Sequence, residues 1–147
     1  MPFETISKAA EAESPVWAAS LRADPELEPV FSPLVPAALR VGVETVYEAY
    51  LVHYGTPRLF AAADNDEAVL LGDYLYAHGL VRIAEAGGVE AVAVMADLIS
   101  RCAALRADGS AGDGEAWVEA ARALGGSFSD EDARRAVALH SGKVALS

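Results

Sequence analysis

Apolar positions repeat at helical spacing along most of the chain. In the segment 36–53, for example, Leu39, Val43, Val46 and Tyr50 recur every three or four residues. This spacing places their side chains on one face of a helix. No run of β-branched residues alternates with polar residues at the period of two that a half-buried strand requires. The pattern therefore predicts an all-α chain.

Proline, glycine and capping residues divide this helical pattern into segments. Ser14 followed by Pro15 is typical of a helix start, and Asp24 followed by Pro25 repeats the pattern. The glycines at 87–88 indicate a turn. The predicted helices cover 3–12, 15–22, a short piece from 24, 36–53, 67–86, 89–106, 115–124 and 129–140. The segment 107–114, which is rich in Gly, Ser and Asp, is predicted to be a mobile loop.

The segment 67–86 is apolar nearly all round, which predicts a central position in the bundle. Gly72 and Gly79 share one face of this predicted helix, and such a pair can let a neighbouring helix approach closely. The segment does not predict a membrane span, because a span needs about 20 largely uncharged residues. Its polar interruptions are Asp73, His78, Arg82 and Glu85.

The composition fits one helical domain. The 147 residues are 53% hydrophobic and 22% charged, which is enough apolar material for a core without disulfides or metals. We predict a single domain over 1–147, with short helices in 1–35 and an antiparallel helical bundle in 36–146.

The charge balance excludes some partners. Eleven basic residues against 22 acidic ones give a net charge of -11, so the surface repels phosphate backbones and anionic lipids. Nucleic-acid binding is therefore not expected. The single cysteine, Cys102, cannot form an intramolecular disulfide, and the N-terminus has no secretory pattern. These features predict a cytoplasmic protein.

Two acidic side chains are candidates for metal binding. Glu44 and Glu48 are four residues apart on one predicted helix face, and carboxylates at that spacing can share a divalent cation with a bound phosphate. The alternative is a solvated acidic face. Asp73 lies among apolar neighbours, so we expect it to be largely buried and to need a partner.

The stretch 68–77 reads Ala-Val-Leu-Leu-Gly-Asp-Tyr-Leu-Tyr-Ala. It resembles the Ala-x-Leu-x-Gly-Asp-x-Leu-x-Ala helix of the trans-polyprenyl diphosphate synthases. These all-α enzymes condense isopentenyl diphosphate onto an allylic diphosphate with Mg²⁺. The family also has a Gly-x-Pro turn about 17 residues earlier, and here Gly-Thr-Pro occupies 55–57, with Gly55 lying 17 residues before Gly72.

Two further motifs of that family fall in register. Its first aspartate-rich motif lands on Glu44 and Glu48, and its Gly-Lys-Thr-Ala-x-Leu motif lands on 142–146, with Lys143 at the lysine position. The resemblance covers about 36–146 and implies part of the isoprenoid synthase fold. It also implies diphosphate binding around Glu44, Glu48, Asp73 and Lys143, with Mg²⁺ held by the two glutamates when a diphosphate is bound.

The chain departs from the family where the chemistry is done. Thr45 stands inside the first acidic motif, and His53 and Tyr54 replace the paired arginines that follow it. The second aspartate-rich motif of the family lies downstream of the lysine motif, and the sequence ends four residues after Lys143. We therefore expect that one chain cannot build the trinuclear Mg²⁺–diphosphate site, and we assign no catalytic residue.

Three functions follow from this interpretation. The first, which we favour, is a non-catalytic accessory subunit, similar to the small subunits of heterodimeric polyprenyl synthases. The second is a homodimeric prenyl-diphosphate-binding protein or prenyltransferase with a reduced metal site. The third is a helical oligomerisation or small apolar ligand-binding module. A homodimer or a heterodimer is expected, because half a synthase-like bundle would leave one side of 67–86 uncovered. The same interpretation places 36–53 and 67–86 as antiparallel neighbours facing one cavity, with Glu44 near its open end.

Overall fold

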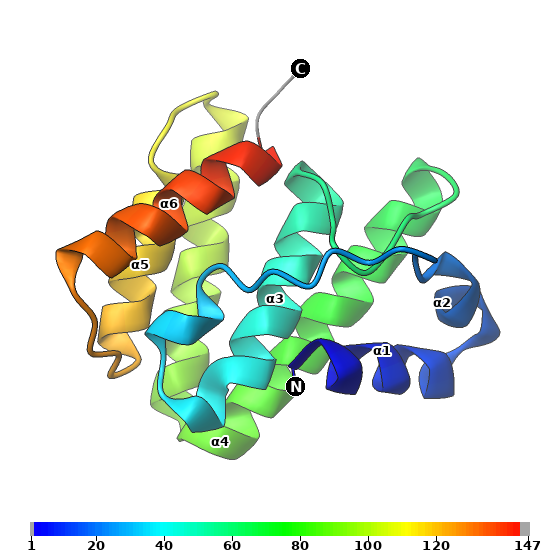
Figure 1. The fold of residues 1–147 in the computed structure, drawn as a ribbon, viewed down its shortest axis with the longest axis horizontal. Helices are drawn as coiled ribbons and strands as arrows, with labels where there is room; N and C mark the ends of the chain where they lie inside the picture. The colour runs from blue at the N-terminus through cyan, green and yellow to red at the C-terminus, as the bar shows by residue number, and fades with distance from the viewer. Residues whose placement is uncertain (1, 145–147) are drawn as a thin grey trace.

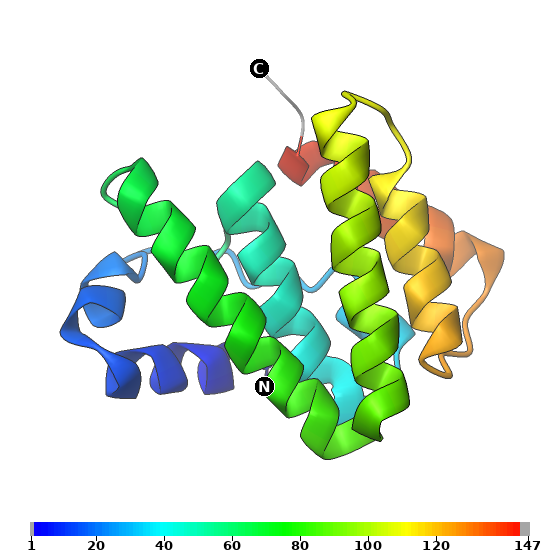
Figure 2. The ribbon, with the colours of Figure 1, turned by 180° about the vertical axis from the view of Figure 1, so that it is seen from behind.

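Two helices, α3 (Arg40–Tyr54) and α4 (Asn65–Ala107), form the centre of the molecule. The structure is a computed structural model, and it describes residues 2–144. All regular structure there is helical. The first half of α4 runs antiparallel to α3 and lies against it (Figures 1 and 2). The remaining elements are α1 (Pro2–Glu13), α2 (Pro15–Ser20), the 3₁₀ turns η1 (Ser32–Leu34) and η2 (Ala37–Leu39), α5 (Asp113–Ala123) and α6 (Asp130–Val144).

Helix α4 reverses the chain direction at Gly88. This residue has φ 74° and ψ -166°, a backbone conformation that residues other than glycine rarely adopt. The two halves of α4 consequently form a V, and α3 lies in its opening (Figure 2). The predicted helices 67–86 and 89–106 are thus the two arms of one kinked helix, and the predicted turn is its kink.

The predicted glycine pair lets α3 and α4 touch. A Cβ at Gly79 would lie 2.6 Å from Cγ2 of Val46, and a Cβ at Gly72 would overlap the ring of His53. Both neighbours belong to α3. Because both positions lack a side chain, the two helices pack directly on each other with no cavity between them at these points. The close approach that the sequence predicted is confirmed.

The other helices cover the flanks. Helix α5 lies beside the second arm of α4, α6 crosses the end of that pair, and α1 packs against α3 on the far side (Figure 1). The main cluster of buried apolar side chains joins α3, the second arm of α4, α5 and α6, with Trp117 among its largest members. A smaller cluster joins α1 to α3 and to the first arm of α4.

The segment after α2 is not helical, so the short helix predicted from Asp24 is wrong. Its backbone bonds to another segment instead: Arg22 N donates to Leu59 O at 2.8 Å, and Glu26 N donates to Arg58 O at 3.0 Å. These bonds use the groups that a helix would have needed internally. They also tie the N-terminal part of the chain to the loop 55–64 that follows α3.

One side of the first arm of α4 remains uncovered. Leu70 and Val81 are 61% and 57% exposed, and Val69 is 52% exposed. Leu70, Val81 and the exposed Ala77 and Ala84 follow one another at helical spacing along this arm, and Val69 lies beside Leu70. We call these five residues the outer face of α4. Within residues 2–144 no helix is long and apolar enough to cross a membrane.

Candidate functional site

The predicted metal ligands Glu44 and Glu48 lie in the core of the protein. Each has 0% of its surface exposed, and both contact the guanidinium of Arg58, which is 1% exposed. Glu44 Oε2 lies 2.5 Å from Arg58 Nη2, and Glu48 Oε1 lies 3.1 Å from Arg58 Nε. The third nitrogen, Nη1, donates to the backbone carbonyl of Glu28 at 2.9 Å. Every guanidinium nitrogen of Arg58 therefore faces an oxygen.

The two carboxylates have different further partners. Glu48 accepts the backbone N–H of Arg58 at 3.0 Å and that of Leu59 at 2.8 Å, so it fixes the loop after α3. Glu44 accepts only the hydroxyl of Ser32, at 2.7 Å, besides its ion pair. Burial raises the pKa of the Glu44 carboxyl, against the lowering effect of Arg58.

This arrangement changes two expectations. Glu44 is not near the open end of a pocket, and the pair does not form a solvated acidic face, because the loop carrying Arg58 covers it. We call Glu44, Glu48 and Arg58 the buried ion cluster. A divalent cation at the two glutamates would have to displace Arg58, so the metal role remains a prediction that the geometry does not favour.

Asp73 and Lys143 lie elsewhere. The Asp73 side chain is 69% exposed, not largely buried as predicted, and its nearest partner is His53 Nε2 at 3.7 Å. Lys143 lies 3.3 Å from Glu26 and 3.5 Å from Glu28, both in the N-terminal segment. The four residues thus occupy three different surroundings. Positions 145–146 of the lysine motif lie outside the described residues.

A second polar cluster, which the sequence did not predict, is centred on Asp113 at the start of α5. Its Oδ2 accepts from Tyr50 OH at 2.7 Å, from Arg106 Nη2 at 2.7 Å and from His140 Nε2 at 2.9 Å. On its other side, His140 Nδ1 lies 2.7 Å from the hydroxyl of Tyr47. The cluster connects α3, α4, α5 and α6.

The protonation of this cluster follows from its geometry. Although burial alone would raise it, the hydrogen bonds from His140 and Tyr50 hold the pKa of the Asp113 carboxyl well below its usual range. Asp113 is therefore ionised and accepts the Nε2–H of His140. In the tautomer that carries its proton on Nε2, Nδ1 accepts the hydroxyl proton of Tyr47.

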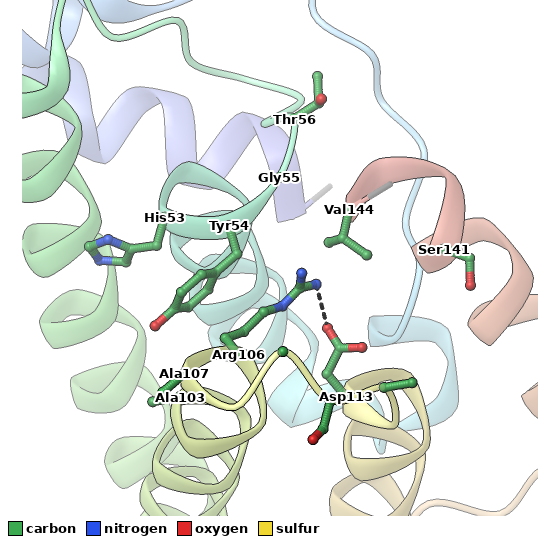
Figure 3. A pocket seen from close by; sticks show the side chains of 13 residues that line it. His53, Tyr54, Gly55, Thr56, Ala103, Arg106, Ala107, Asp113, Ser141 and Val144 are labelled. Atoms are coloured by element: carbon green, nitrogen blue, oxygen red, sulfur yellow. Dashed lines mark hydrogen bonds and ion pairs between the residues drawn. The ribbon is translucent and has the colours of Figure 1, made fainter. Parts of the chain in front are cut away.

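A cavity of about 930 Å³ opens above this second cluster. Figure 3 shows it between the end of α3, the end of α4 with the loop after it, the start of α5 and the last turns of α6. We call it the Arg106 cavity. Its lining residues are His53, Tyr54, Gly55, Thr56, Ala103, Arg106, Ala107, Gly109, Ser110, Ala111, Asp113, Ser141 and Val144.

Arg106 and Asp113 form the polar floor of this cavity. Their side chains are 19% and 15% exposed, so both reach the cavity surface. Arg106 Nε donates to Tyr50 OH at 3.0 Å, and Nη2 donates to Asp113. Its Nη1 has no hydrogen bond to any described residue, and Figure 3 shows the guanidinium tip directed toward the space between Tyr54 and Val144. Nη1 of Arg106 is thus held in position and reaches the cavity without a hydrogen-bond partner among residues 2–144.

No metal centre is evident in the part of the chain that the structure describes: no three His, Cys, Asp or Glu side chains gather around one point. Comparisons with protein-family models, with curated proteins and with solved structures found no match to this chain. The resemblance to polyprenyl synthases therefore remains an interpretation of the sequence.

Sequence reasoning missed the residues that organise both clusters. Arg58 directly follows the Gly-Thr-Pro turn at 55–57, but that motif assigns it no role, and Arg106 is an ordinary basic residue near a helix end. His140 is far from the other histidines in the sequence, and it lies 93 residues from its partner Tyr47. The only local signal was the pair of acidic residues in α3. Such a pair does not reveal whether a distant arginine closes over it.

Proposed function

We propose that this chain is a non-catalytic accessory subunit that acts by helix–helix association, with the outer face of α4 as its contact surface and a full-length polyprenyl diphosphate synthase as its partner. The observation that carries the association is the exposure of Val69, Leu70 and Val81 along one side of a central helix. The partner class comes from the sequence resemblance and is part of the proposal.

The buried ion cluster supports the non-catalytic part. In the resemblance, Glu44 and Glu48 occupy the positions of the Mg²⁺-binding acidic motif. Here both carboxylates are enclosed and engaged by Arg58 and by backbone N–H groups. Removing a buried carboxylate from its cation costs several kcal/mol, which a weakly bound Mg²⁺ does not readily offset.

The charge around the outer face favours a partner other than a second copy. Asp66 and Asp73 are exposed at the same end of this face, and the chain carries a net charge of -11. Two copies packed with these helices parallel would bring the like charges together, which opposes that form of association. A partner with an apolar helix flanked by lysine or arginine complements the face in both respects.

The test replaces one apolar side chain of the outer face by a charged one. The chain is mixed with a full-length synthase encoded by the same genome, and complex formation is followed by size-exclusion chromatography with light scattering, together with the chain length of the prenyl product. Leu70→Glu is expected to abolish the complex. Leu27→Glu is the matched control, because Leu27 is similarly exposed, at 56%, but lies outside α4.

A complex that forms with the control and not with Leu70→Glu supports the proposal. The absence of any complex with the synthase, or unchanged product length in its presence, would overturn it. A stable homodimer of the chain alone that Leu70→Glu dissociates would overturn the synthase as partner and show that the outer face binds a second copy.

A further inference from the structure

We propose that the Arg106 cavity is a binding site for a small uncharged molecule with a carbonyl oxygen, such as an amide or a lactam, and an apolar body. The carbonyl oxygen accepts from Nη1 of Arg106, and the apolar body lies against the alanine side chains of α4 and the loop after it. This inference goes beyond the proposed association and does not depend on it.

The hydrogen-bonding capacity of Arg106 carries the first step. A guanidinium has five N–H donors. Nε is engaged by Tyr50 and Nη2 by Asp113, which also fix the plane of the group. The rings of Tyr50 and Tyr54 lie 5.8 and 5.7 Å from its central carbon, which further restricts it. The donors on Nη1 are thus held in a defined direction toward the cavity, as a preorganised binding group requires.

The charge balance of the cavity selects an uncharged acceptor over an anion. The charge of Arg106 is already neutralised by Asp113, at 2.7 Å. The other titratable ring, His53, has its pKa lowered by burial and is neutral at pH 7.5. Helices α3, α4 and α6 end at the cavity and α5 begins there, so three C-termini with partial negative charge outnumber one N-terminus with partial positive charge. An anion would gain one donor but would meet Asp113 and this excess of helix C-termini, whereas a carbonyl oxygen gains the donor without that repulsion.

The walls of the cavity select the rest of the ligand. Ala103 and Ala107 present methyl groups from one side of α4, and Ala111 and Val144 add apolar surface from the loop and from α6. The volume of about 930 Å³ lies in the usual range for small-molecule sites. A ring of six to ten atoms attached to the carbonyl group therefore fits the cavity.

The experiment compares four probes of matched or deliberately different charge: benzamide, benzoate, benzylamine and inorganic pyrophosphate. Binding to the ¹⁵N-labelled chain at pH 7.5 is measured from amide shifts in two-dimensional spectra. Benzamide is expected to bind with a dissociation constant on the order of 1 mM, as small fragments do. Its shifts should fall on the amides of Gly55, Gly109 and Ser110, which line the cavity. Benzoate and benzylamine are expected to bind at least ~5-fold more weakly, the difference that a lost or opposed polar contact produces.

Two variants test the site without depending on one fold-sensitive change. Arg106→Met removes the donor and keeps the apolar stem, and its thermal melting curve reports whether the chain still folds. Ala107→Trp fills the cavity and leaves Arg106 in place. Its matched control is Ala104→Trp, because Ala104 is exposed on the same helix but does not line the cavity. We expect benzamide affinity to fall at least ~10-fold in Ala107→Trp and to stay unchanged in Ala104→Trp, since the added ring occupies the ligand volume in only one of them.

Several outcomes would overturn the inference. They are the absence of benzamide shifts at about 20 mM, where a fragment site saturates, equal binding to Ala107→Trp and Ala104→Trp, and tighter binding of benzoate or pyrophosphate than of benzamide. Leu70→Glu should bind benzamide like the unaltered chain, because Leu70 lies outside the cavity. Failure of the association proposal and failure of this one are therefore distinguishable.

Discussion

The buried ion cluster and the floor of the Arg106 cavity contain the same kinds of group, but they differ in exposure to solvent and in how many arginine nitrogens are paired. Each has an arginine held by a carboxylate and packed against aromatic rings: Phe3 and Tyr47 for Arg58, Tyr50 and Tyr54 for Arg106. Arg58 is 1% exposed and each of its three nitrogens faces an oxygen, whereas Arg106 is 19% exposed and Nη1 has no such partner.

This difference assigns a structural role to the buried ion cluster and a ligand-binding role to the Arg106 cluster. The buried ion cluster is closed to water, and its Arg58 Nη2 and Glu44 Oε2 contact each other as an ion pair without a hydrogen bond. Such a cluster stabilises one arrangement of the chain, and breaking it leaves buried charges unpaired. In the second cluster, Tyr50 and Asp113 fix Arg106 while Nη1 faces the cavity, so this donor remains available to a ligand. The four predictions below test this distinction, from the largest expected effect to the smallest.

Arg58→Met should have the largest effect on stability. It leaves Glu44 and Glu48 buried without a counter-charge, and we expect the free energy of unfolding to fall by about 3–5 kcal/mol. Urea unfolding at pH 7 measures this. Arg106→Met is the comparison, because Asp113 keeps His140 and Tyr50 as donors. A loss from Arg106→Met that equals or exceeds the loss from Arg58→Met would remove the distinction between the clusters.

Glu48→Gln should be the next most damaging change. Both oxygens of Glu48 face N–H donors of Arg58 and Leu59, so an amide nitrogen in either position would point a donor at donors. Leaving a buried donor unpaired costs about 1–3 kcal/mol, and we expect a loss near the upper end of that range. Amide hydrogen exchange at Leu59 should also become faster. Unchanged protection there would show that Glu48 does not fix the loop.

Asp113→Asn should cost about 2 kcal/mol at pH 7, because a hydrogen bond to a charged acceptor is replaced by one to a neutral acceptor. The cost should depend on pH. The pKa of Asp113 is lowered on folding, so its contribution to stability is present above the unfolded value of 3.8 and is lost as the pH falls below it. The difference between the unfolding free energies of variant and parent should therefore begin to shrink as the pH falls from 4 to 2. A constant difference over that interval would contradict the assignment.

Glu44→Gln should have the smallest effect, below about 1 kcal/mol at pH 7. Its carbonyl can face Arg58 while its NH₂ donates to the hydroxyl of Ser32, the groups that Glu44 now contacts. Because the pKa of Glu44 is raised on folding, its protonated form stabilises the native state below the unfolded value of 4.5, and that contribution is lost as the pH rises. The variant should thus gain stability relative to the parent as the pH rises above 4.5. A relative loss over that range would show that the charged form is the stabilising one.

The two glutamates also show where sequence reasoning stopped. Their spacing correctly placed both on one face of a helix, and the glycines at 72 and 79 correctly predicted close contact between α3 and α4. Which face was covered was not predictable from that spacing, because Arg58 reaches it from a loop without a regular pattern. The prediction for Asp73 was wrong in the opposite sense. Its apolar neighbours along the chain predicted burial, but no helix of the described residues covers the side of α4 that carries it.

By itself, the sequence determined the all-helical character of the chain, most helix positions and the reversal at Gly88, because helical periodicity, capping residues and glycine conformation act over a few neighbouring residues. The tertiary structure alone decided which polar groups are closed to water and which remain open. Enclosure depends on segments brought together from a distance, as His140 meets Tyr47 across 93 residues. The candidate site of this protein is therefore the arginine that the fold left partly free, not the acidic pair that the sequence made conspicuous.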